Sequence, residues 1–256
     1  MSKYLTYKKD SNLENAHRFK KLMDIVQGIL STKNPKQITI LDIGSGDGQF
    51  MKFIKKESSE KINFRFIGID KYVTDKSFDF ELKNCNIEEG IDITDGSVDI
   101  VIAGEIIEHL KNTDYFIQEV HRVLKNDGDL IITTPNLAGY MNRLLLLFGY
   151  QPYHAEVSEV ESGFGNGIIA KVLGRPMYGN KTAGHLRLFT YRALFDFVNY
   201  YGFKIQKYYP IYYSGFREDN KRIFLIKIAF FIDKYLSIIF PKMANGMIFH
   251  LKLKEK

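Results

Sequence analysis

The stretch that decides the fold is LDIGSGDGQF, which occupies residues 41–50 and has a glycine at every second position of its loop. These glycines, Gly44, Gly46 and Gly48, directly follow an apolar run and directly precede a helix-like segment. Glycine lets the backbone turn tightly and approach a ligand closely. The spacing is G-x-G-x-G, because Gln49 stands where a dinucleotide-binding loop has its third glycine. The stretch therefore predicts a strand-to-helix turn that either binds another kind of ligand or is only a tight turn.

Short apolar runs alternate with helix-like segments on both sides of this loop. The runs predict five strands, at residues 37–44, 62–70, 80–87, 97–105 and 129–136. Helices are expected before and between them, at residues 13–30, 49–57, 73–78 and 105–124. Because parallel strands need crossover connections, this alternation predicts an α/β fold whose parallel sheet is covered by helices on both faces.

The pattern changes after Pro135, where residues 137–150 predict one strongly apolar helix. Residues 161–184 then contain six glycines, which predicts a long mobile loop. We expect residues 137–184 to form a lid inserted into a single domain that spans residues 1–256. Regular structure is expected to resume with a helix at 190–202, a strand at 203–213, a helix at 221–240 and a last strand at 246–254.

Charge is distributed unevenly along the 256 residues, whose net charge is +6. Residues 1–136 contain 19 Lys and Arg against 22 Asp and Glu, a balance of −3, whereas residues 137–256 contain 17 against 8, a balance of +9. The basic second half predicts an anionic partner, such as a phosphate-bearing glycan lipid, a membrane surface or RNA. Cys85 is the only cysteine, which excludes a disulfide scaffold and a cysteine-based zinc site. The first residues contain no apolar signal segment, so we expect a cytoplasmic protein, with peripheral membrane contact as an alternative.

Two acidic residues accompany the glycine loop. Asp42 lies inside the end of the first predicted strand, where a carboxylate would repel a phosphate but would suit a cationic ligand. Asp70 closes the second strand, where a carboxylate can accept hydrogen bonds from both hydroxyls of a ribose. Together the two residues predict a ligand that has both a positive charge and a ribose.

With these residues in place, the chain resembles the class I S-adenosylmethionine-dependent methyltransferases and is similar to the ubiquinone-pathway O-methyltransferases. The resemblance covers residues 38–136 and resumes at 185–210. It implies a seven-stranded, mostly parallel Rossmann-like sheet in the order 3-2-1-4-5-7-6 with an antiparallel last strand, and S-adenosylmethionine as cofactor with S-adenosylhomocysteine as product. The cofactor-binding residues that it implies are Asp42, Gly44, Ser45, Gly46, Asp70, Lys71, Asn86, Ile87, Ala103 and Glu105. Asn86 stands where the family often has an aspartate that accepts from the adenine amino group.

The segment AGEIIEHL, residues 103–110, follows the fourth predicted strand. In the expected helix, Glu105, Glu108 and His109 would share one face because they stand at positions i, i+3 and i+4. Three interpretations stay open. His109 is a catalytic base that takes a hydroxyl proton during methyl transfer, or the residues hold a metal ion, or Glu105 caps the helix while His109 packs locally.

His185 belongs to a second segment, GHLRLFTYRAL at residues 184–194. Together with TTPN at residues 133–136 it is similar to the small-RNA 3′-end 2′-O-methyltransferases, where a histidine joins two glutamates and another histidine on a metal. The resemblance implies, as an alternative, a metal set of Glu105, Glu108, His109 and His185. The chain departs from that pattern by its glycine-rich insertion. His185 is otherwise a second candidate catalytic base or a residue that orders its loop.

These observations lead to one leading function and two alternatives. The leading one is methylation of an oxygen in a small-molecule, glycan or lipid-linked acceptor, and the alternatives are a metal-assisted RNA 2′-O-methyltransferase and a non-catalytic S-adenosylmethionine-binding protein. The residues expected to contact the acceptor are Tyr140, Arg143, Tyr153, His154, Arg175 and Tyr178. Residues 223–240 predict either a helix packed on the sheet or an interfacial helix on a membrane, since the charged residues within them argue against a membrane-spanning helix.

Overall fold

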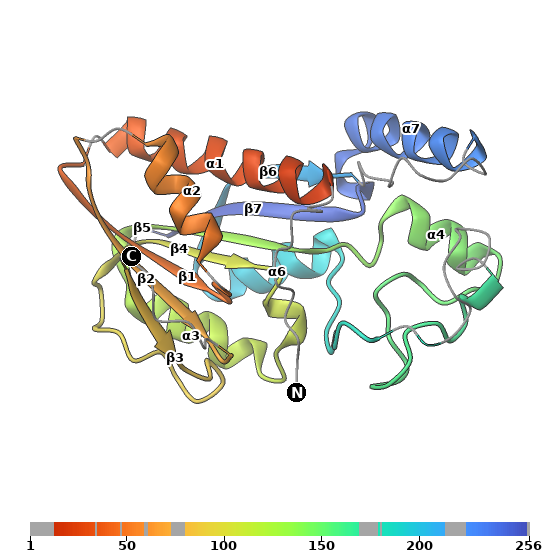
Figure 1. Cartoon of the computed structure of the whole chain (residues 1–256), viewed down its shortest axis with the longest axis horizontal. Coiled ribbons are helices and arrows are strands. Elements are labelled where there is room, and N and C mark those ends of the chain that lie inside the picture. Colours follow the sequence, from red (N-terminus) through yellow and green to blue (C-terminus); the bar gives the residue numbers. More distant parts are fainter. Residues whose placement is uncertain are drawn as a thin grey trace.

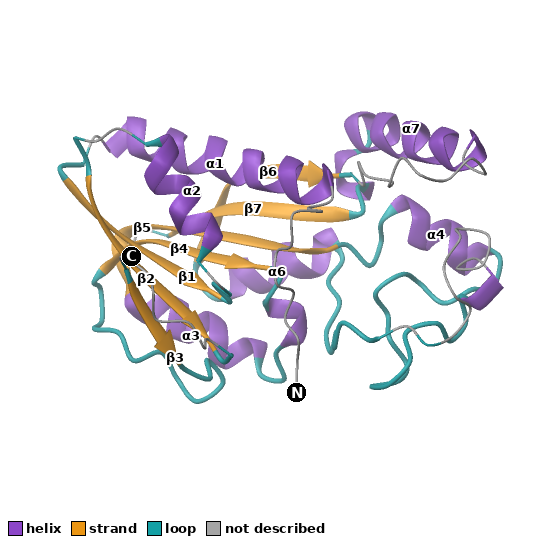
Figure 2. Cartoon of the chain, in the orientation of Figure 1, coloured by secondary structure: helices purple, strands orange, loops and turns teal. Residues whose placement is uncertain are grey.

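A computed structural model describes residues 13–33, 35–46, 48–58, 61–72, 80–168, 179, 181–212 and 224–254 of the chain. It shows a central seven-stranded sheet with helices on both faces and two further helices beyond one end of the sheet (Figure 1). Figure 2, which separates helices from strands by colour, shows the same layers. The predicted α/β fold is confirmed.

The sheet has the strand order that the family resemblance implied, β3-β2-β1-β4-β5-β7-β6. Its strands are β1 (Gln37–Ile43), β2 (Asn63–Asp70), β3 (Glu81–Asn84), β4 (Val98–Gly104), β5 (Leu124–Pro135), β6 (Phe203–Ile211) and β7 (Gly246–Leu253). β7 pairs antiparallel with β5 and with β6, and the other pairs are parallel. The expected antiparallel last strand is therefore confirmed as well.

Helices cover both faces of the sheet and bury β1 between them. α1 (Leu13–Lys33) and α2 (Gln49–Glu57) lie on one face, and α3 (Thr113–Val123) and α6 (Tyr191–Tyr200) lie on the other (Figure 1). Six of the seven residues of β1 are buried, and alternate ones join two separate apolar clusters. Ile40 belongs to the cluster with α1, whereas Leu41 belongs to the cluster with α3. A strand buried on both faces is expected to be continuously apolar, which explains the sequence of β1.

The strand order reverses beside β1, and in doubly wound sheets such a reversal opens a crevice at the carboxyl edge. β1 lies between β2 and β4, and Asp42 pairs in register with Gly68 on β2 and with Ile102 on β4. The connections from β1 and from β4 run in opposite directions across the sheet, because the strand order reverses there. In doubly wound sheets such a reversal is where ligands bind. The fold therefore places the glycine loop and the end of β4 on the two sides of one crevice.

Most predicted elements are present with shifted ends. The third strand covers Glu81–Asn84 rather than residues 80–87, and the helix predicted at 73–78 lies outside the described residues. The helix predicted over residues 105–124 begins only at Thr113. The eight residues before Thr113 therefore have a different conformation from the one that their sequence predicted.

Glu105 is the residue at which the predicted helix fails to start. Its φ is 53°, in the left-handed region, and its N–H donates to the backbone oxygen of Thr133 on β5 at 3.0 Å. This bond extends the end of β4 along β5 instead of beginning a helix. Only one 3-10 turn, Ile107–His109, follows before α3. The prediction that Glu105, Glu108 and His109 share a helix face is therefore wrong.

Two helices lie beyond the carboxyl edge of the sheet and next to each other (Figure 1). α4 (Tyr140–Leu147) follows β5, and α7 (Phe224–Ile239) precedes a 3-10 turn at Pro241–Met243 and then β7. Residues 148–166, after α4, form an irregular segment. Among the helices of the described residues, none combines the length and the hydropathy that crossing a membrane requires.

Candidate functional site

The glycine loop forms the turn between β1 and α2. Gly44 and Gly48 have φ values of 76° and 67°, which residues with a side chain rarely adopt. The N–H of Gly44 donates to the backbone oxygen of Ile69 at 2.8 Å, so the loop is fastened to β2. A Cβ atom on Gly48 would lie 2.5 Å from Cζ of Phe80, whereas no described atom lies within 4 Å of the same position on Gly46. The backbone at Gly46 therefore faces open space that a ligand can occupy.

Gly68 on β2 belongs to the same site and was missed from the sequence. A Cβ atom there would lie 2.4 Å from Cδ2 of Leu82 and 2.7 Å from Oγ of Ser45. The loop can pack directly on β2 only because residue 68 has no side chain. Ser45 Oγ is itself buried and has no hydrogen-bond partner among the described residues. The signal for Gly68 was a glycine inside a predicted strand, which often marks a close backbone approach.

Asp70 ends β2 and fastens the loop from its other side. Its Oδ2 accepts from the N–H of Gly46 at 2.9 Å, and its Oδ1 accepts from the N–H of Tyr72 at 2.8 Å. Each carboxylate oxygen has two lone pairs, so each can accept one further hydrogen bond. This geometry fits the ribose-binding role that was predicted for Asp70.

Asp42 is a buried carboxylate close to Asp70. Burial first, and the charge of Asp70 second, raise the pKa of Asp42 to about 7. A cation bound beside the pair would favour ionised Asp42, because it offsets both the burial and the repulsion. The acidic pair, the open backbone at Gly46 and the hydroxyl of Ser45 therefore fit S-adenosylmethionine, which has cationic groups and two ribose hydroxyls.

Asn86 follows β3 and makes local contacts. Its Nδ2 donates to Oε1 of Glu89 at 2.7 Å, and its Oδ1 accepts from the N–H of Glu88 at 3.4 Å. The carboxamide oxygen keeps a lone pair beside this long bond, so it can still accept from an amino group. The adenine-binding role of Asn86 stays a prediction.

The remaining residues predicted to bind the cofactor lie around the same edge. Lys71 directly follows Asp70, and its Nζ lies 6.0 Å from the ring centre of Tyr72. Ile87 and Ala103 are buried, and Ala103 pairs in register with the last residue of β1. Their positions are compatible with the predicted roles, which stay predictions.

Glu105 is held at the end of β4 by two other elements. Its Oε1 accepts from Oγ1 of Thr133 at 2.7 Å and lies 3.4 Å from a guanidinium nitrogen of Arg18 on α1. The carboxylate is thus engaged by β5 and α1. Of the four residues in the alternative metal set, Glu105 is the one that does not join the others.

Glu108 is fully buried in the 3-10 turn after β4. Its Oε2 accepts from Oγ1 of Thr134 at 3.0 Å, whereas its Oε1 has no hydrogen-bond partner among the described residues. Burial first, and the charge of Glu105 second, hold the pKa of Glu108 well above its ordinary value. A buried carboxylate with one unused oxygen is costly unless it is protonated or meets a cation.

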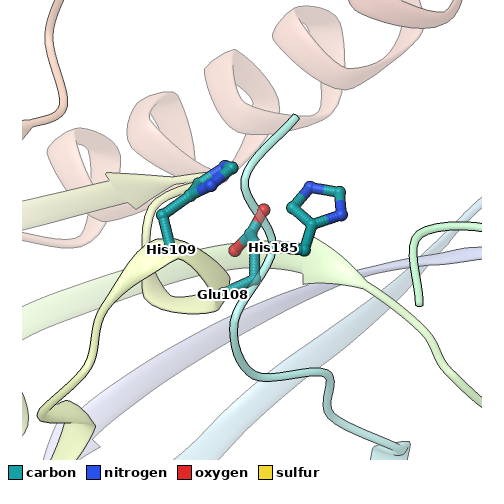
Figure 3. Close-up of side chains that lie close together, drawn as sticks. All are labelled: Glu108, His109 and His185. Carbon is teal, nitrogen blue, oxygen red and sulfur yellow. The ribbon is translucent and has the colours of Figure 1, made fainter. Parts of the chain in front are cut away.

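Two imidazole rings flank this carboxylate, and Figure 3 shows them on either side of it. The ring centroids of His109 and His185 lie 4.8 Å apart. Nδ1 of His109 lies 3.1 Å from the backbone oxygen of Gly184, and Nδ1 of His185 lies 3.1 Å from that of His154. Because a carbonyl oxygen can only accept, Nδ1 is the nitrogen of each ring that donates a proton to this contact.

Glu108, His109 and His185 form what we call the Glu–His–His cluster. Each offers one ligand-type atom, and these atoms lie within 4.8 Å of one another. Burial lowers the pKa of His109, so its ring is mainly neutral at pH 7. Two imidazoles and a carboxylate form a donor set that divalent transition metals accept, and carbonyl partners on Nδ1 commonly fix the tautomer of metal-bound histidines. A neutral imidazole is equally suited to take a proton.

Glu156 holds the segment that contains His185 and was also missed from the sequence. Its carboxylate accepts from three consecutive N–H groups, those of Ala183 at 2.7 Å, Gly184 at 2.7 Å and His185 at 3.0 Å. The irregular segment after α4 is thereby fastened to the segment before α6. The nearest of these N–H groups belongs to a residue 27 positions later in the chain, and no sequence pattern links residues so far apart. The sequence therefore contained no signal for the role of Glu156.

Two of the predicted acceptor contacts lie beside the cluster. The ring centroid of His154 is 5.2 Å from that of His185, and burial lowers the pKa of His154 to about 4. The ring of Tyr153 lies 5.8 Å from that of His154. The two rings border the side of the cluster that faces the irregular segment.

The other predicted acceptor contacts are not brought to the cluster. Tyr140 begins α4, and Arg143 is exposed on the same helix with its Nε bonded to the backbone oxygen of Ala138 at 2.8 Å. Arg175 and Tyr178 lie outside the described residues. Whether any of these residues contacts an acceptor stays a prediction.

A cavity of about 30 Å³ lies between Glu105 and His154. It is also lined by Arg18, Pro135, Ile211, Tyr212, Asn245 and Gly246. This volume holds little more than a water molecule, whereas ligand pockets are about tenfold larger or more. An acceptor can therefore enter here only if the lining segments move.

Comparison with known proteins gives a family match over most of the chain. A family model described as a methyltransferase domain matches residues 15–208. The mitochondrial ubiquinone biosynthesis O-methyltransferase of Mus musculus is 32% identical over 125 residues, which cover 44% of this chain and 32% of that protein. Its counterpart in Bos taurus is 34% identical over 125 residues with the same coverage of 44% and 32%. The aligned part thus spans about a third of the length of these relatives.

Solved structures with a similar fold include further methyltransferases. One from Methanosarcina mazei, described as S-adenosylmethionine-dependent, has a TM-score of 0.54 at 17% identity and covers 90% of this chain and 98% of its own. The 1,6-didemethyltoxoflavin-N1-methyltransferase of Burkholderia thailandensis, with bound S-adenosylhomocysteine, has a TM-score of 0.51 at 12% identity and covers 91% and 78%. At these identities the likeness establishes the fold.

Proposed function

This chain belongs to the class I S-adenosylmethionine-dependent methyltransferases, and we propose that it methylates an oxygen atom of a small-molecule, glycan or lipid-linked acceptor. The bound cofactor supplies a methyl group that its sulfonium already activates, so the protein needs mainly to position the acceptor. The similarity to ubiquinone biosynthesis O-methyltransferases supports oxygen as the methylated atom. Membership of an enzyme family favours catalysis over the alternative of a non-catalytic binding protein.

The observation that carries the proposal is the imidazole of His109, whose Nδ1 lies 3.1 Å from the backbone oxygen of Gly184. A hydroxyl is a poor nucleophile until it loses its proton, so methylation of oxygen calls for a base at this place. The hydrogen bond from Nδ1 of His109 to Gly184 leaves Nε2 as the basic nitrogen. We assign Nε2 of His109 as the group that takes the hydroxyl proton, with His185 as the second candidate.

Metal assistance is a second candidate form of the same function. The unused oxygen of Glu108 favours it, because a divalent cation would give this buried carboxylate a partner. Glu108, His109 and His185 would hold the ion, and its chemistry would be to lower the pKa of a hydroxyl. In this form the 2′-hydroxyl of RNA becomes an acceptor, and the basic second half supports an acceptor with negative charge.

The atom that is methylated can be tested with tritium-labelled S-adenosylmethionine and pairs of acceptors that differ only in the reacting atom. Catechols and their amino analogues make one such pair, and sugar alcohols and amino sugars make another, with short single-stranded RNA as a separate arm. We expect label in O-methyl products. Label in the amines alone would contradict the proposal.

The same assay with EDTA separates the two forms of the site. Activity that EDTA leaves unchanged supports His109 as a direct base. Loss of activity that zinc or magnesium restores supports metal assistance and makes the Glu–His–His cluster the expected ligand set.

A further inference from the structure

In its described part, residues 231–239, α7 exposes most of its apolar side chains and buries Asp233 and Ser237, which reverses the ordinary pattern of a surface helix. Over residues 231–240 the only buried side chains are Asp233 and Ser237. In contrast, Phe231 is 61% exposed and Ile239 is 64% exposed. In this part α7 contributes no side chain to either apolar cluster of the described core.

α4 contacts α7 (Figure 1) and buries Asn142 together with Leu145, while its last residues are apolar and exposed. Asn142 is buried, whereas Leu147 is 74% exposed and Phe148, directly after the helix, is 72% exposed. Both neighbouring helices therefore expose apolar side chains to the surroundings. We define the apolar surface as Leu146, Leu147, Phe148, Phe231, Ile232, Tyr235, Ile238, Ile239 and Phe240, all of which are exposed.

A buried network of amides explains why the polar sides of both helices face inward. Asn142 on α4 donates from Nδ2 to the backbone oxygen of Asn136 at 3.0 Å. Asn136 in turn donates from its own Nδ2 to the backbone oxygen of Ala244 at 2.8 Å. Asn245 donates from Nδ2 to Oδ1 of Asp233 on α7 at 2.7 Å. These hydrogen bonds fix the rotation of both helices about their axes. The exposed apolar side chains therefore point away from the sheet.

Within α4, the described part of α7 and the 3-10 turn after it, the exposed charges are positive. Arg143 on α4 and Lys234 on α7 are exposed, and Lys242 is exposed in the 3-10 turn after α7. Asp233 is the only acidic residue in the two helices, and it is buried against Asn245. Aromatic and aliphatic side chains flanked by exposed basic ones are the composition of helices that lie in the interface of an anionic bilayer.

We propose that α4 and α7 form a docking surface for an anionic lipid bilayer, on which both helices lie without crossing it. A second copy of the chain is the less suitable occupant. A twofold interface would bury the same basic residues, Arg143, Lys234 and Lys242, from both copies, and the described part of the surface offers them no exposed acidic partner. Anionic headgroups instead give each of these cations a partner.

The docking surface lies close to the catalytic side of the molecule. α4 starts five residues after the end of β5, and the irregular segment that follows α4 contains His154 and Glu156, which border the Glu–His–His cluster. A bilayer on this surface would therefore lie beside the route by which an acceptor reaches the cluster. A lipid-linked acceptor is therefore favoured over a freely dissolved one, and this consequence rests on the proposed function. The docking of the protein on a bilayer does not depend on that function.

The test is co-sedimentation of the full chain with phosphatidylcholine vesicles, with and without phosphatidylglycerol. We expect binding to the anionic vesicles that weakens as salt is added. Leu147→Ser combined with Ile239→Ser should lower the partition coefficient about tenfold or more, since apolar area on both helices is lost. Tyr200→Ser is the matched control, because Tyr200 is 84% exposed on α6 and lies outside the surface. Its binding should equal that of the wild type.

Charge and self-association are tested with the same proteins. Lys234→Glu combined with Lys242→Glu should weaken binding to anionic vesicles several-fold and remove most of its salt dependence. Wild-type protein that binds neither vesicle would overturn the proposal, as would a dimer in sedimentation velocity that the Leu147→Ser, Ile239→Ser protein no longer forms. Titration with S-adenosylhomocysteine shows that each variant is folded. Because no methyl transfer is measured, failure of docking would leave the proposed function intact.

Discussion

The glycine loop and the Glu–His–His cluster lie on opposite sides of one crevice, yet the chain builds them in different ways. The loop consists of consecutive residues whose conformation is set by Gly44 and Gly48 and by bonds to the adjacent strand β2. The cluster joins Glu108 and His109 to His185, and Glu156 and the backbone of Gly184 hold the distant residue in place. The loop, where we propose that the cofactor binds, is therefore locally determined, whereas the cluster, where we propose proton transfer, depends on a long-range contact. Variants can separate the two sides.

The largest effect is expected from removing the imidazoles. His109→Ala and His185→Ala should each lower the rate of methyl transfer by roughly 10²- to 10⁴-fold, which is the usual contribution of a general base. S-adenosylhomocysteine should bind both variants as it binds the wild type, because the glycine loop is untouched. Steady-state kinetics and isothermal titration measure the two quantities.

His121→Ala serves as the control for these variants, since His121 lies on α3 and contacts Phe203 rather than the crevice. It should retain wild-type rates. A His109→Ala enzyme with unchanged kcat would remove His109 from the proposed mechanism, and weakened cofactor binding in it would show that the two sides are not independent.

A smaller effect, confined to the cofactor side, is expected from the pKa of Asp42. Only the ionised carboxylate favours a cationic ligand, so S-adenosylmethionine should bind about tenfold more tightly per pH unit up to about pH 7, and the affinity should then level off. Asp42→Asn should bind more weakly and lose this dependence. Titration calorimetry between pH 5 and about pH 8 measures both.

The raised pKa of Asp42 also determines how the free energy of unfolding of the ligand-free protein changes with pH. The folded chain holds the Asp42 proton up to about pH 7, whereas the unfolded chain releases it near its ordinary value of 3.8. Its contribution to the free energy of unfolding is therefore present at low pH and is lost as pH rises through this window. Thermal unfolding should show that loss in the wild type and a smaller one in Asp42→Asn. Parallel pH profiles would contradict the assignment, and Asp92→Asn, at a residue exposed beside Lys83, is the control.

The smallest effect is expected from weakening the hydrogen bonds by which Glu156 holds residues 183–185. Glu156→Gln replaces a carboxylate that accepts three N–H bonds with a neutral amide, which should cost about 1.5–3 kcal/mol locally. Because His185 would then be less well positioned, kcat should fall about tenfold while cofactor affinity stays constant. Stopped-flow or steady-state rates measure this change.

Glu159→Gln is the matched control for Glu156→Gln. Its contact with Thr182 is made by the backbone oxygen of Glu159, at 2.8 Å, and is kept in the variant. A Glu156→Gln enzyme as fast as this control would show that the three hydrogen bonds do not position His185.

Residues 105–112 show where sequence reasoning fails. Their composition favours a helix, but the N–H and the carboxylate of Glu105 bond to Thr133, and Ile107 is buried in the core. Tertiary contacts with β5 outweigh the local preference, which is worth only tenths of a kcal/mol per residue. The pairing of Glu108 with His109 was therefore expected for the wrong reason, although both residues do lie in the cluster.

The apolar segment 223–240 shows a second limit of the sequence. Its hydropathy predicted a helix, and α7 is one, but periodicity could not tell whether the apolar side faces the sheet or the surroundings. The answer depends on Asn136, Asn142 and Asn245, which form the inward polar contacts. Because these amides are distant from one another in the sequence, they produce no periodic pattern that predicts which way the apolar side of α7 faces.

The sequence by itself determined the order and type of the main elements, the glycine loop and the two carboxylates that make a cationic, ribose-bearing ligand fit there. These features are short-range, because strand periodicity and glycine conformations depend on neighbouring residues. Only the tertiary structure decided that His185 meets His109, that Glu156 fastens its segment, that Gly68 admits Ser45, and that α4 and α7 turn their apolar sides outward. Each of these depends on burial and on hydrogen bonds between distant segments, whose free energies exist only once the chain has folded.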